Sequence, residues 1–476
     1  MSLVAGCGPA PEAAGERIGL AYAFVPVAGL SPYSDDAVIG YGIGATETLV
    51  SLDAAGRPQP LLAESWTQVD PLTWRFQLRP GVRFHDGSAM TAEVVMQDLQ
   101  RAVAATPRPR ALSGVEFTAR AEGEDVVVNT AAPDPVFPQR LSSPELAVLA
   151  RSAYADPANP DLLGAGTGPY VLEELDGTSG ATLDANPDYW GGAPAADGVD
   201  VRFLSEGVAR ANALRAEEVD IAHAVPVSQL QSLGDGNVLL SVPLPRTVSL
   251  HLTSTSPVFA DPGLRSAARQ AVTGLDVAGS IYEGQADRPE GLFGPVSSWA
   301  TVRPVPSHPD PAAVEGQAIT LATYSDRAEM PEIAAAVADA LRRAGFQVDL
   351  VVRLYTELEE QLLAGEFDAV LMSRSYGQDT ADPLSYLAAD FGCDGGYNLS
   401  LFCDPEVDAQ LVAASQLSDV DARQAAALRV ENRVLASDVV VPLVHERTRF
   451  GVSKEVSGLA DDPWERAIIT RDTALG

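Results

Sequence analysis

The segment 319–372 constrains the fold more than any other part of the chain, because patterns typical of strands and helices alternate along it. Three short apolar runs have strand character: Ile319–Thr323, Phe346–Val352 and Phe367–Met372. Between them, 331–344 and 356–364 repeat apolar residues at helical spacing, and Gly345 and Gly365 follow them as stops. Strand, helix and strand in this order form a unit of parallel sheet. We therefore predict an α/β fold.

An earlier segment combines a strand pattern with a helix pattern. The apolar residues that alternate with polar ones are Trp74, Phe76, Leu78, Val82 and Phe84, with a Pro-Gly turn after the third. Thr91 is placed to cap a helix that ends before Pro107, and 125–129 has the pattern of a short strand. We predict a strand meander followed by a helix.

The chain is long and strongly acidic. Its 476 residues are enough for two or three domains of roughly 150 residues. With 65 Asp and Glu against 32 Lys and Arg, the net charge is −33, which repels phosphate backbones and anionic lipids. The single lysine, Lys454, lies in neither a P-loop nor a Schiff-base motif. Nucleic acid is therefore not an expected partner, and no cofactor is expected.

Motifs of catalysis and metal binding are missing from the sequence. There is no G-x-S-x-G elbow and no H-E-x-x-H pair, and the five histidines are scattered without paired spacing. The glycine-rich stretch 164–168 is followed by the strand-like Pro169-Tyr170-Val171, whereas a dinucleotide-binding loop opens a helix. The missing motifs make a hydrolase less favoured.

The three cysteines point to an oxidising compartment. Cys393 and Cys403 flank a turn-rich stretch, which suits a disulfide that closes a short loop. Cys7 follows Leu3-Val4-Ala5-Gly6, which matches the cleavage box ahead of a lipidated bacterial cysteine, so we expect lipid attachment there and a flexible tether in residues 1–15. No run of 18 apolar residues is present, so no membrane-spanning helix is expected.

Several stretches together resemble the family 5 extracellular solute-binding proteins of bacterial ABC importers, and the resemblance covers nearly the whole chain. In chain order they are Thr46–Leu49, Leu61–Trp66, Trp74–Asp98, Gly166–Tyr170, Asn186–Trp190, Asp382-Pro383, Tyr397-Asn398 and Asp404–Asp408. Each stretch is short, and their common order and spacing carry the resemblance. Their most characteristic residues are assigned to packing and turns: Trp66, Trp74, Pro80, Gly87, Tyr189 and Trp190.

The resemblance implies a two-lobed periplasmic-binding-protein-like fold, in its large three-domain variant of class II, with a ligand cleft between the lobes. It divides the chain into a lobe I core, a subdomain inserted in lobe I, and lobe II. The expected bounds are 16–45, 165–245 and 447–476 for the core, 46–164 for the insertion and 250–442 for lobe II. Hinges are expected near Pro245 and 442–446, and binding would shift the population toward a closed state.

The resemblance also implies the cargo and the partners. Peptide-binding relatives place an aspartate four residues before a proline to receive the peptide ammonium group, and Asp379 stands at that distance from Pro383. A charge-assisted bond in a dry cleft suits this role. Tyr376 matches an aromatic position of the same pocket. The further ligand-binding candidates are Arg374, Gln378, Tyr397, Tyr41 and His445.

A nickel chelate is the alternative cargo, because Thr323–Arg327 and Asp390-Phe391 resemble the nickel-binding branch. His445 would then be the metal-reaching imidazole, while a chelator-binding arginine of that branch is replaced near Glu145. We expect a monomer that is lipid-anchored at the extracellular face of the cell membrane or lies in the periplasm, and that delivers its ligand to the permease of an ABC importer. A ligand-sensing receptor and a secreted hydrolase remain alternatives of a different class.

Overall fold

The computed structural model describes residues 16–377 and 380–476, and a ten-stranded mixed sheet runs through its centre. In sheet order the strands are β14 (Gln347–Arg353), β13 (Ala318–Tyr324), β15 (Ala369–Ser375), β12 (Asn237–Leu252), β16 (Val440–Ser453), β11 (Ile221–Ala222), β1 (Arg17–Tyr22), β10 (Gly198–Phe203), β9 (Gly180–Ala185) and β8 (Tyr170–Asp176). The sheet has two ends with separate hydrophobic cores, joined through the long strands β12 and β16. The molecule is therefore two-lobed, with lobe I around β1 and lobe II around β13.

The strands and helices of lobe II follow the predicted alternation. β13 pairs in parallel with both β14 and β15, and the connecting helices are α7 (Met330–Arg343) and α8 (Tyr355–Leu363). Gly345 and Gly365 follow these helices with φ of +110° and +69°, a backbone conformation that side chains with a Cβ rarely adopt. Ile333, Val337 and Leu341 of α7 are fully buried against the sheet. The predicted α/β class is confirmed.

Aspartate caps begin most of the other helices of lobe II. These helices are α5 (Pro262–Val272), α6 (Val277–Ser280), α9 (Pro383–Phe391), α10 (Pro405–Ser415) and α11 (Val420–Ala436). In each, the aspartate before the first residue accepts a hydrogen bond from a backbone N–H of the first turn. The predicted disulfide between Cys393 and Cys403 is present and closes the loop between α9 and α10.

Lobe I carries a separate four-stranded antiparallel sheet. Its order is β4 (Ala63–Asp70), β5 (Thr73–Leu78), β7 (Asp125–Thr130) and β6 (Phe117–Glu122), and α2 (Ala92–Ala104) packs on it. Thr91 caps α2 as predicted, because its side chain accepts from the Val94 N–H. The strand expected at Val82 and Phe84 is wrong. Gly81 and Gly87 have positive φ and form tight turns on either side of this stretch. An isolated antiparallel bridge pairs Arg83 with Ala89.

Shorter elements complete the described chain. They are α1 (Ala37–Gly42), α3 (Phe137–Arg140), α4 (Gly207–Arg215), β2 (Val50–Leu52), β3 (Pro58–Pro60), β17 (Val456–Ser457), β18 (Ala474–Leu475) and the 3-10 turns η1 (Arg110–Leu112), η2 (Pro144–Leu146), η3 (Arg151–Ala155), η4 (Val227–Ser232) and η5 (Ser298–Ala300). None of the described helices is both long and apolar enough to cross a membrane.

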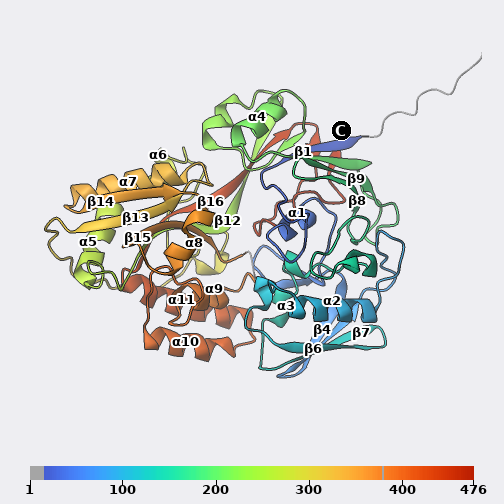
Figure 1. The fold of residues 1–476 in the computed structure, drawn as a ribbon, viewed down its shortest axis with the longest axis horizontal. Coiled ribbons are helices and arrows are strands. Elements are labelled where there is room, and N and C mark those ends of the chain that lie inside the picture. Colours follow the sequence, from blue (N-terminus) through green and yellow to red (C-terminus); the bar gives the residue numbers. More distant parts are fainter. Residues whose placement is uncertain (1–15, 378–379) are drawn as a thin grey trace, which may run out of the picture.

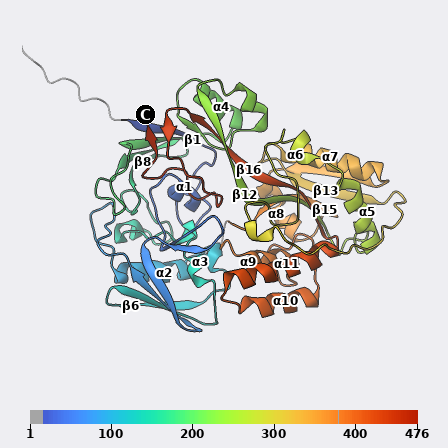
Figure 2. The same ribbon diagram turned by 180° about the vertical axis from the view of Figure 1, so that it is seen from behind.

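The two lobes meet along β12 and β16, which cross the middle of the molecule (Figure 1). The view from behind shows the same crossing. Below it, the helices α9–α11 lie on one side, and α2 with the four-stranded sheet lies on the other (Figure 2). The register of β12 against β16 shifts between Pro243 and Thr247 and again between Val248 and Ser249. A bulge interrupts regular pairing and increases local twist. The bounds of the three-part division and the two hinges stay predictions.

Candidate functional site

The carboxyl ends of parallel strands from both lobes point to the same place. In lobe I, β1 is parallel to β10 and β11, and the last residue of β11, Ala222, pairs with Gly451 of β16. In lobe II, the last residue of β15, Ser375, pairs with Arg246 of β12. Ligands of open α/β sheets bind outside the carboxyl ends of the strands. We call this place the junction: residues 243–249 of β12, residues 444–449 of β16 and the strand ends that face them.

A buried glutamate lies at the centre of the junction. Glu446 of β16 is 5% exposed and accepts hydrogen bonds from the Tyr282 hydroxyl at 3.0 Å and from the Ser373 hydroxyl. Burial alone would raise the pKa of Glu446, but the charges of Arg327 and Arg246 outweigh burial and lower it. Glu446 is therefore a fixed negative charge inside the protein.

Two arginines tie the lobes together beside this glutamate. Arg246 of β12 donates to Glu465 of the C-terminal segment at 2.8 Å and 3.3 Å. Arg449 of β16 donates to the Val225 carbonyl at 2.9 Å and to Glu329, at the start of α7, at 2.8 Å. Both guanidinium groups are already paired within the protein.

Arg327 differs from these two arginines. It follows the carboxyl end of β13, and Glu446 approaches its guanidinium at 3.7 Å. Among the residues that the structure describes, its guanidinium makes no hydrogen bond, although its side chain is only 30% exposed. A guanidinium presents five N–H donors in a planar fork that matches a carboxylate. Arg327 is thus placed and equipped to bind an anionic group between the lobes.

Tyr376, a predicted site residue, lies at the end of β15 in an aromatic box. Its hydroxyl is 2.5 Å from the Ser297 hydroxyl, and its ring meets Phe293 and Trp464 edge-on at centroid distances of 5.2 Å and 5.8 Å. It is 5% exposed, so most of its ring is covered by the protein. Beyond it, the Gly377 carbonyl accepts from Arg466 at 3.0 Å.

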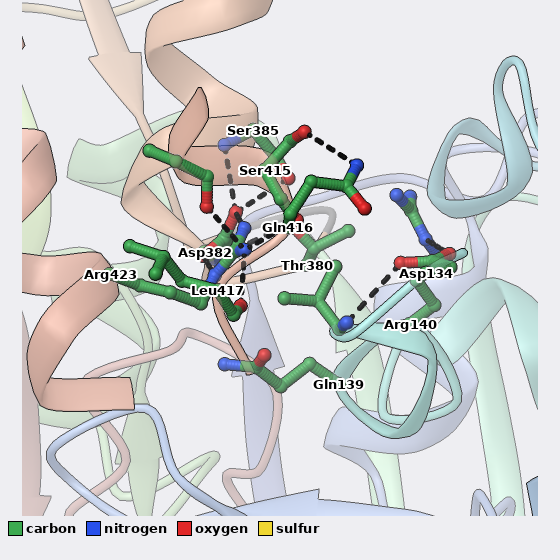
Figure 3. Close-up of polar contacts among 12 residues, drawn as sticks. Asp134, Gln139, Arg140, Thr380, Asp382, Ser385, Ser415, Gln416, Leu417 and Arg423 are labelled. Carbon is green, nitrogen blue, oxygen red and sulfur yellow. Dashed lines mark hydrogen bonds and ion pairs between the residues drawn. The ribbon is translucent and has the colours of Figure 1, made fainter. Parts of the chain in front are cut away.

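The loop after Tyr376 carries the two other predicted contacts, Gln378 and Asp379, which lie outside the described residues. Its far end is held by Asp382, whose carboxylate accepts from Arg423 at 2.7 Å and 3.0 Å and from the Ser385 N–H at 2.9 Å (Figure 3). The Asp134–Arg140 pair of lobe I lies on the other side of this view (Figure 3). The described residues Gly377 and Asp382 are therefore each bonded to an arginine, Arg466 and Arg423 respectively.

Arg374 and Tyr397 belong to a different cluster from Glu446. Successive side chains of a strand point to opposite faces, so Arg374 lies across the sheet from Ser373. Arg374 donates to both oxygens of Asp390 at 2.7 Å and 2.8 Å and stacks on the Tyr397 ring at 3.7 Å from its centroid. The structure therefore does not bring these two predicted residues together with the junction charges.

His445, the predicted metal-reaching residue, is 1% exposed and has both ring nitrogens engaged. Nε2 accepts from the Glu290 N–H at 3.3 Å, and Nδ1 lies 2.8 Å from the Thr247 hydroxyl. Burial, together with the charge of Arg303, lowers the pKa of His445 to about 4. No group of three or more His, Cys, Asp or Glu side chains within 16–377 and 380–476 is arranged to hold a metal.

Tyr41, the last predicted contact, lies in α1, where burial raises its pKa and the charges of Asp462 and Arg466 act on it. Sequence reasoning did not assign the charged junction residues to the site. They are Arg246, Arg327, Glu446 and Glu465. A usable signal was present for the first three, because a charged side chain inside or directly after a buried strand must find a partner or a ligand.

The amino-acid sequence of this chain is similar to those of known proteins. The model of the family "Bacterial extracellular solute-binding proteins, family 5 Middle" matches residues 57–398. The probable di/tripeptide-binding protein 5 of Pseudomonas aeruginosa (strain UCBPP-PA14) is 26% identical over 474 residues, which cover 89% of this chain and 88% of that protein.

Two solved structures are similar over nearly the whole chain. The dipeptide binding protein from Pseudoalteromonas sp. SM9913 in complex with Met-Leu has a TM-score of 0.82 at 18% identity, covering 97% of this chain and 100% of that one. NikA from Staphylococcus aureus in complex with Ni(L-His)2 has a TM-score of 0.81 at 19% identity, with coverage of 97% and 100%. Both show that the fold is shared.

Proposed function

The chain belongs to the bacterial extracellular solute-binding proteins of family 5, and from that premise we propose that it captures short peptides between its lobes for an ABC importer. The relative from P. aeruginosa is a probable di/tripeptide-binding protein, which supports a peptide cargo. Closure of the lobes would enclose the peptide, and the closed form would deliver it to the permease.

The observation that carries this proposal is the state of Arg327. Its guanidinium has no hydrogen bond among the described residues, faces the junction and is held in place by Glu446 at 3.7 Å. A peptide carboxylate would supply the missing acceptor with two parallel charge-assisted bonds. Asp379, which follows Tyr376 by three positions in the sequence, would receive the ammonium group at the other end of the peptide. The two ends of a short zwitterion would thus meet opposite charges.

A nickel chelate is the second candidate, because NikA from S. aureus shares the fold in complex with Ni(L-His)2. The geometry of His445 favours the peptide instead. A metal ligand must offer a free ring nitrogen, and both nitrogens of His445 are bonded to Thr247 and Glu290. Rearrangement of this buried ring would have to precede any metal contact.

The test is isothermal titration of the purified protein with a dipeptide, Ala-Phe, and with its C-terminal amide and its N-acetyl form. Wild-type protein should bind Ala-Phe, and each blocked form should bind about a hundredfold more weakly, because one buried charge loses its partner. Arg327→Gln should weaken Ala-Phe and remove the discrimination against the amide, while Asp379→Asn should do the same for the acetyl form.

The control variant is Arg353→Gln, which removes an exposed arginine at the end of the neighbouring strand β14. It should leave all affinities within about twofold. Binding of nickel with histidine in the absence of any peptide binding would contradict the proposal and assign the chain to the metal-chelate branch.

We also propose a lipid anchor at Cys7 and the three-part division of the chain. Cys7 lies outside the described residues, and mass spectrometry of the protein from its native membrane would detect an acylated N-terminus. The three-part division is supported by the separate α2 sheet and by the passage of β12 and β16 between the lobes. We propose that the protein acts as a monomer that binds its ligand without transforming it.

A further inference from the structure

Four aromatic rings gather at the carboxyl edge of the parallel strands of lobe I. They are Tyr22, Phe24, His223 and Phe450, and their centroid distances are 4.9 Å for Tyr22–His223, 5.7 Å for Phe24–His223, 5.8 Å for Tyr22–Phe24 and 5.1 Å for His223–Phe450. We call this group the aromatic shelf. Three of its members are buried, with exposures of 1%, 6% and 4% for Tyr22, His223 and Phe450. Phe24 is 45% exposed and forms the accessible part of the shelf.

Hydrogen bonds to Asp36 restrain the loop between β1 and α1, which carries Phe24. The Asp36 carboxylate is 2% exposed and accepts hydrogen bonds from the N–H groups of Val27 at 3.2 Å, Ala28 at 2.7 Å and Leu30 at 3.1 Å. Backbone donors fixed on one buried carboxylate restrict the loop between β1 and α1. Phe24 therefore leaves β1 on a restrained backbone.

The shelf lies across the junction from Arg327. His223 follows β11, and burial together with the charges of Arg210 and Arg327 lowers its pKa to about 3. Arg449 links the two neighbourhoods, because it donates to the Val225 carbonyl, two residues after His223, at 2.9 Å and to Glu329, two residues after Arg327, at 2.8 Å. The ring is neutral, and its Nδ1 is buried without a hydrogen-bond partner among the described residues. This uncharged ring stacks on Phe450 and packs against the exposed Phe24 at a centroid distance of 5.7 Å.

Resting on the proposed function, we infer that Phe24 and His223 form a subsite for an uncharged apolar or aromatic side chain of the peptide whose carboxylate Arg327 holds. Such a side chain would cover the exposed face of Phe24, since aromatic pairs gain from offset or edge contacts beyond the area they bury. A lysine or arginine side chain would lose its hydration against these uncharged rings without gaining a charged partner there, so it should bind more weakly.

The experiment compares Ala-Phe, Ala-Lys and Ala-Ala by isothermal titration against wild type, Phe24→Ala and Val27→Ala. Val27 is the matched control, because it is 83% exposed in the same loop and lies outside the shelf. Wild-type protein should bind Ala-Phe more tightly than Ala-Ala and Ala-Lys. Phe24→Ala should weaken Ala-Phe about tenfold and change Ala-Ala less than twofold, as expected for loss of one aromatic contact. Val27→Ala should change neither.

The outcomes separate this inference from the proposed function. If wild type binds Ala-Phe and Ala-Ala equally, or if Phe24→Ala weakens both to the same degree, the subsite is wrong while peptide binding stands. If no dipeptide binds at all, the proposed function fails first. Phe24→Tyr keeps the ring and should restore the affinity for Ala-Phe, which distinguishes loss of contact from loss of folding.

Discussion

Glu47 in lobe I and Glu446 at the junction are equally buried, at 5% exposure, yet their surroundings shift their pKa values in opposite directions. Glu47 accepts from the Tyr189 hydroxyl at 2.7 Å and from the Trp190 ring N–H at 2.9 Å, which are neutral donors. Glu446 lies between the charges of Arg327 and Arg246. Burial raises the pKa of Glu47 to about 7 despite its hydrogen bonds, whereas the pKa of Glu446 is lowered.

The difference shows that burial fixes the desolvation cost of a carboxylate while its neighbours decide its charge. Neutral donors make Glu47 a packing residue that holds the Tyr189-Trp190 corner, in agreement with the predicted packing role of that pair. The arginines lower the pKa of Glu446, and its carboxylate lies 3.7 Å from the Arg327 guanidinium. The same substitution at both positions should therefore give unequal results.

The largest effect is expected for Glu446→Gln. Loss of this charge leaves Arg327 and Arg246 in a buried site with less compensation, and removal of one partner of a buried pair costs about 3–5 kcal/mol of unfolding free energy. Urea unfolding at pH 7 measures it. Glu360→Gln, an exposed position on α8, is the control and should change the unfolding free energy by less than about 0.5 kcal/mol. A loss equal to that of the control would mean that the junction charges are solvated.

Glu47→Gln should change the pH dependence of stability instead. The folded-state pKa of Glu47 is raised from 4.5 to about 7, so the stability that its protonated form gives is fully present below pH 4.5 and is lost as the pH rises to about 7. The loss amounts to on the order of 3 kcal/mol. Glutamine stays neutral and avoids it.

Thermal unfolding of wild type and Glu47→Gln from pH 4.5 to 8 measures the difference. The melting temperature of the variant relative to that of wild type should increase as the pH rises, and the variant should be the more stable protein at pH 8. For Glu446 the sign is opposite, because its pKa is lowered and its contribution is lost as the pH falls below the ordinary value. If the melting temperatures of wild type and Glu47→Gln change with pH in the same way, the pKa of Glu47 is not raised and the contrast with Glu446 is wrong.

The smallest effect is expected for Arg79→Gln. The Arg79 guanidinium lies 4.3 Å from the centroid of the Trp190 ring, and its charge partly lowers the pKa of Glu47. The variant should lose about 0.5–1 kcal/mol of cation–π attraction, and it should raise the pKa of Glu47 further. The pH dependence of thermal unfolding would then move to higher pH. Arg429→Gln, at an exposed position of α11, should leave that profile unchanged.

The elements were predictable where the signal is local. The apolar spacing of residues 331–344 and the glycine after it gave α7 to within one residue, because period and cap depend on neighbours in sequence. The strand expected at Val82 and Phe84 failed because positive φ at Gly81 and Gly87 turns the backbone before pairing can extend. The Pro-Gly turn itself was predicted, whereas the alternation does not show that pairing after it is reduced to an isolated bridge between Arg83 and Ala89.

The site was less predictable, because its contacts join residues far apart in the sequence. Glu446 meets Ser373 and Tyr282 only after β12, β15 and β16 pair in the central sheet. His445 was assigned a metal-reaching role, but its partner Thr247 is 198 residues away, and no local pattern reveals that pairing. The resemblance supplied Asp379 and Tyr376 as contacts, whereas it included Arg327 only within the stretch Thr323–Arg327, and the geometry then singled out its guanidinium.

The central position of β16 has a consequence for the order of synthesis. This strand follows β1–β15 in the chain, yet it lies between β12 and β11 in the middle of the sheet. A ribosome-bound chain that ends before residue 440 has both outer parts of the sheet but lacks the strand that joins them. Domains tend to fold as units during synthesis, so the lobes can collapse separately while their union waits for the late strand. The two lobes would thereby stay unjoined until β16, Val440–Ser453, has been synthesised.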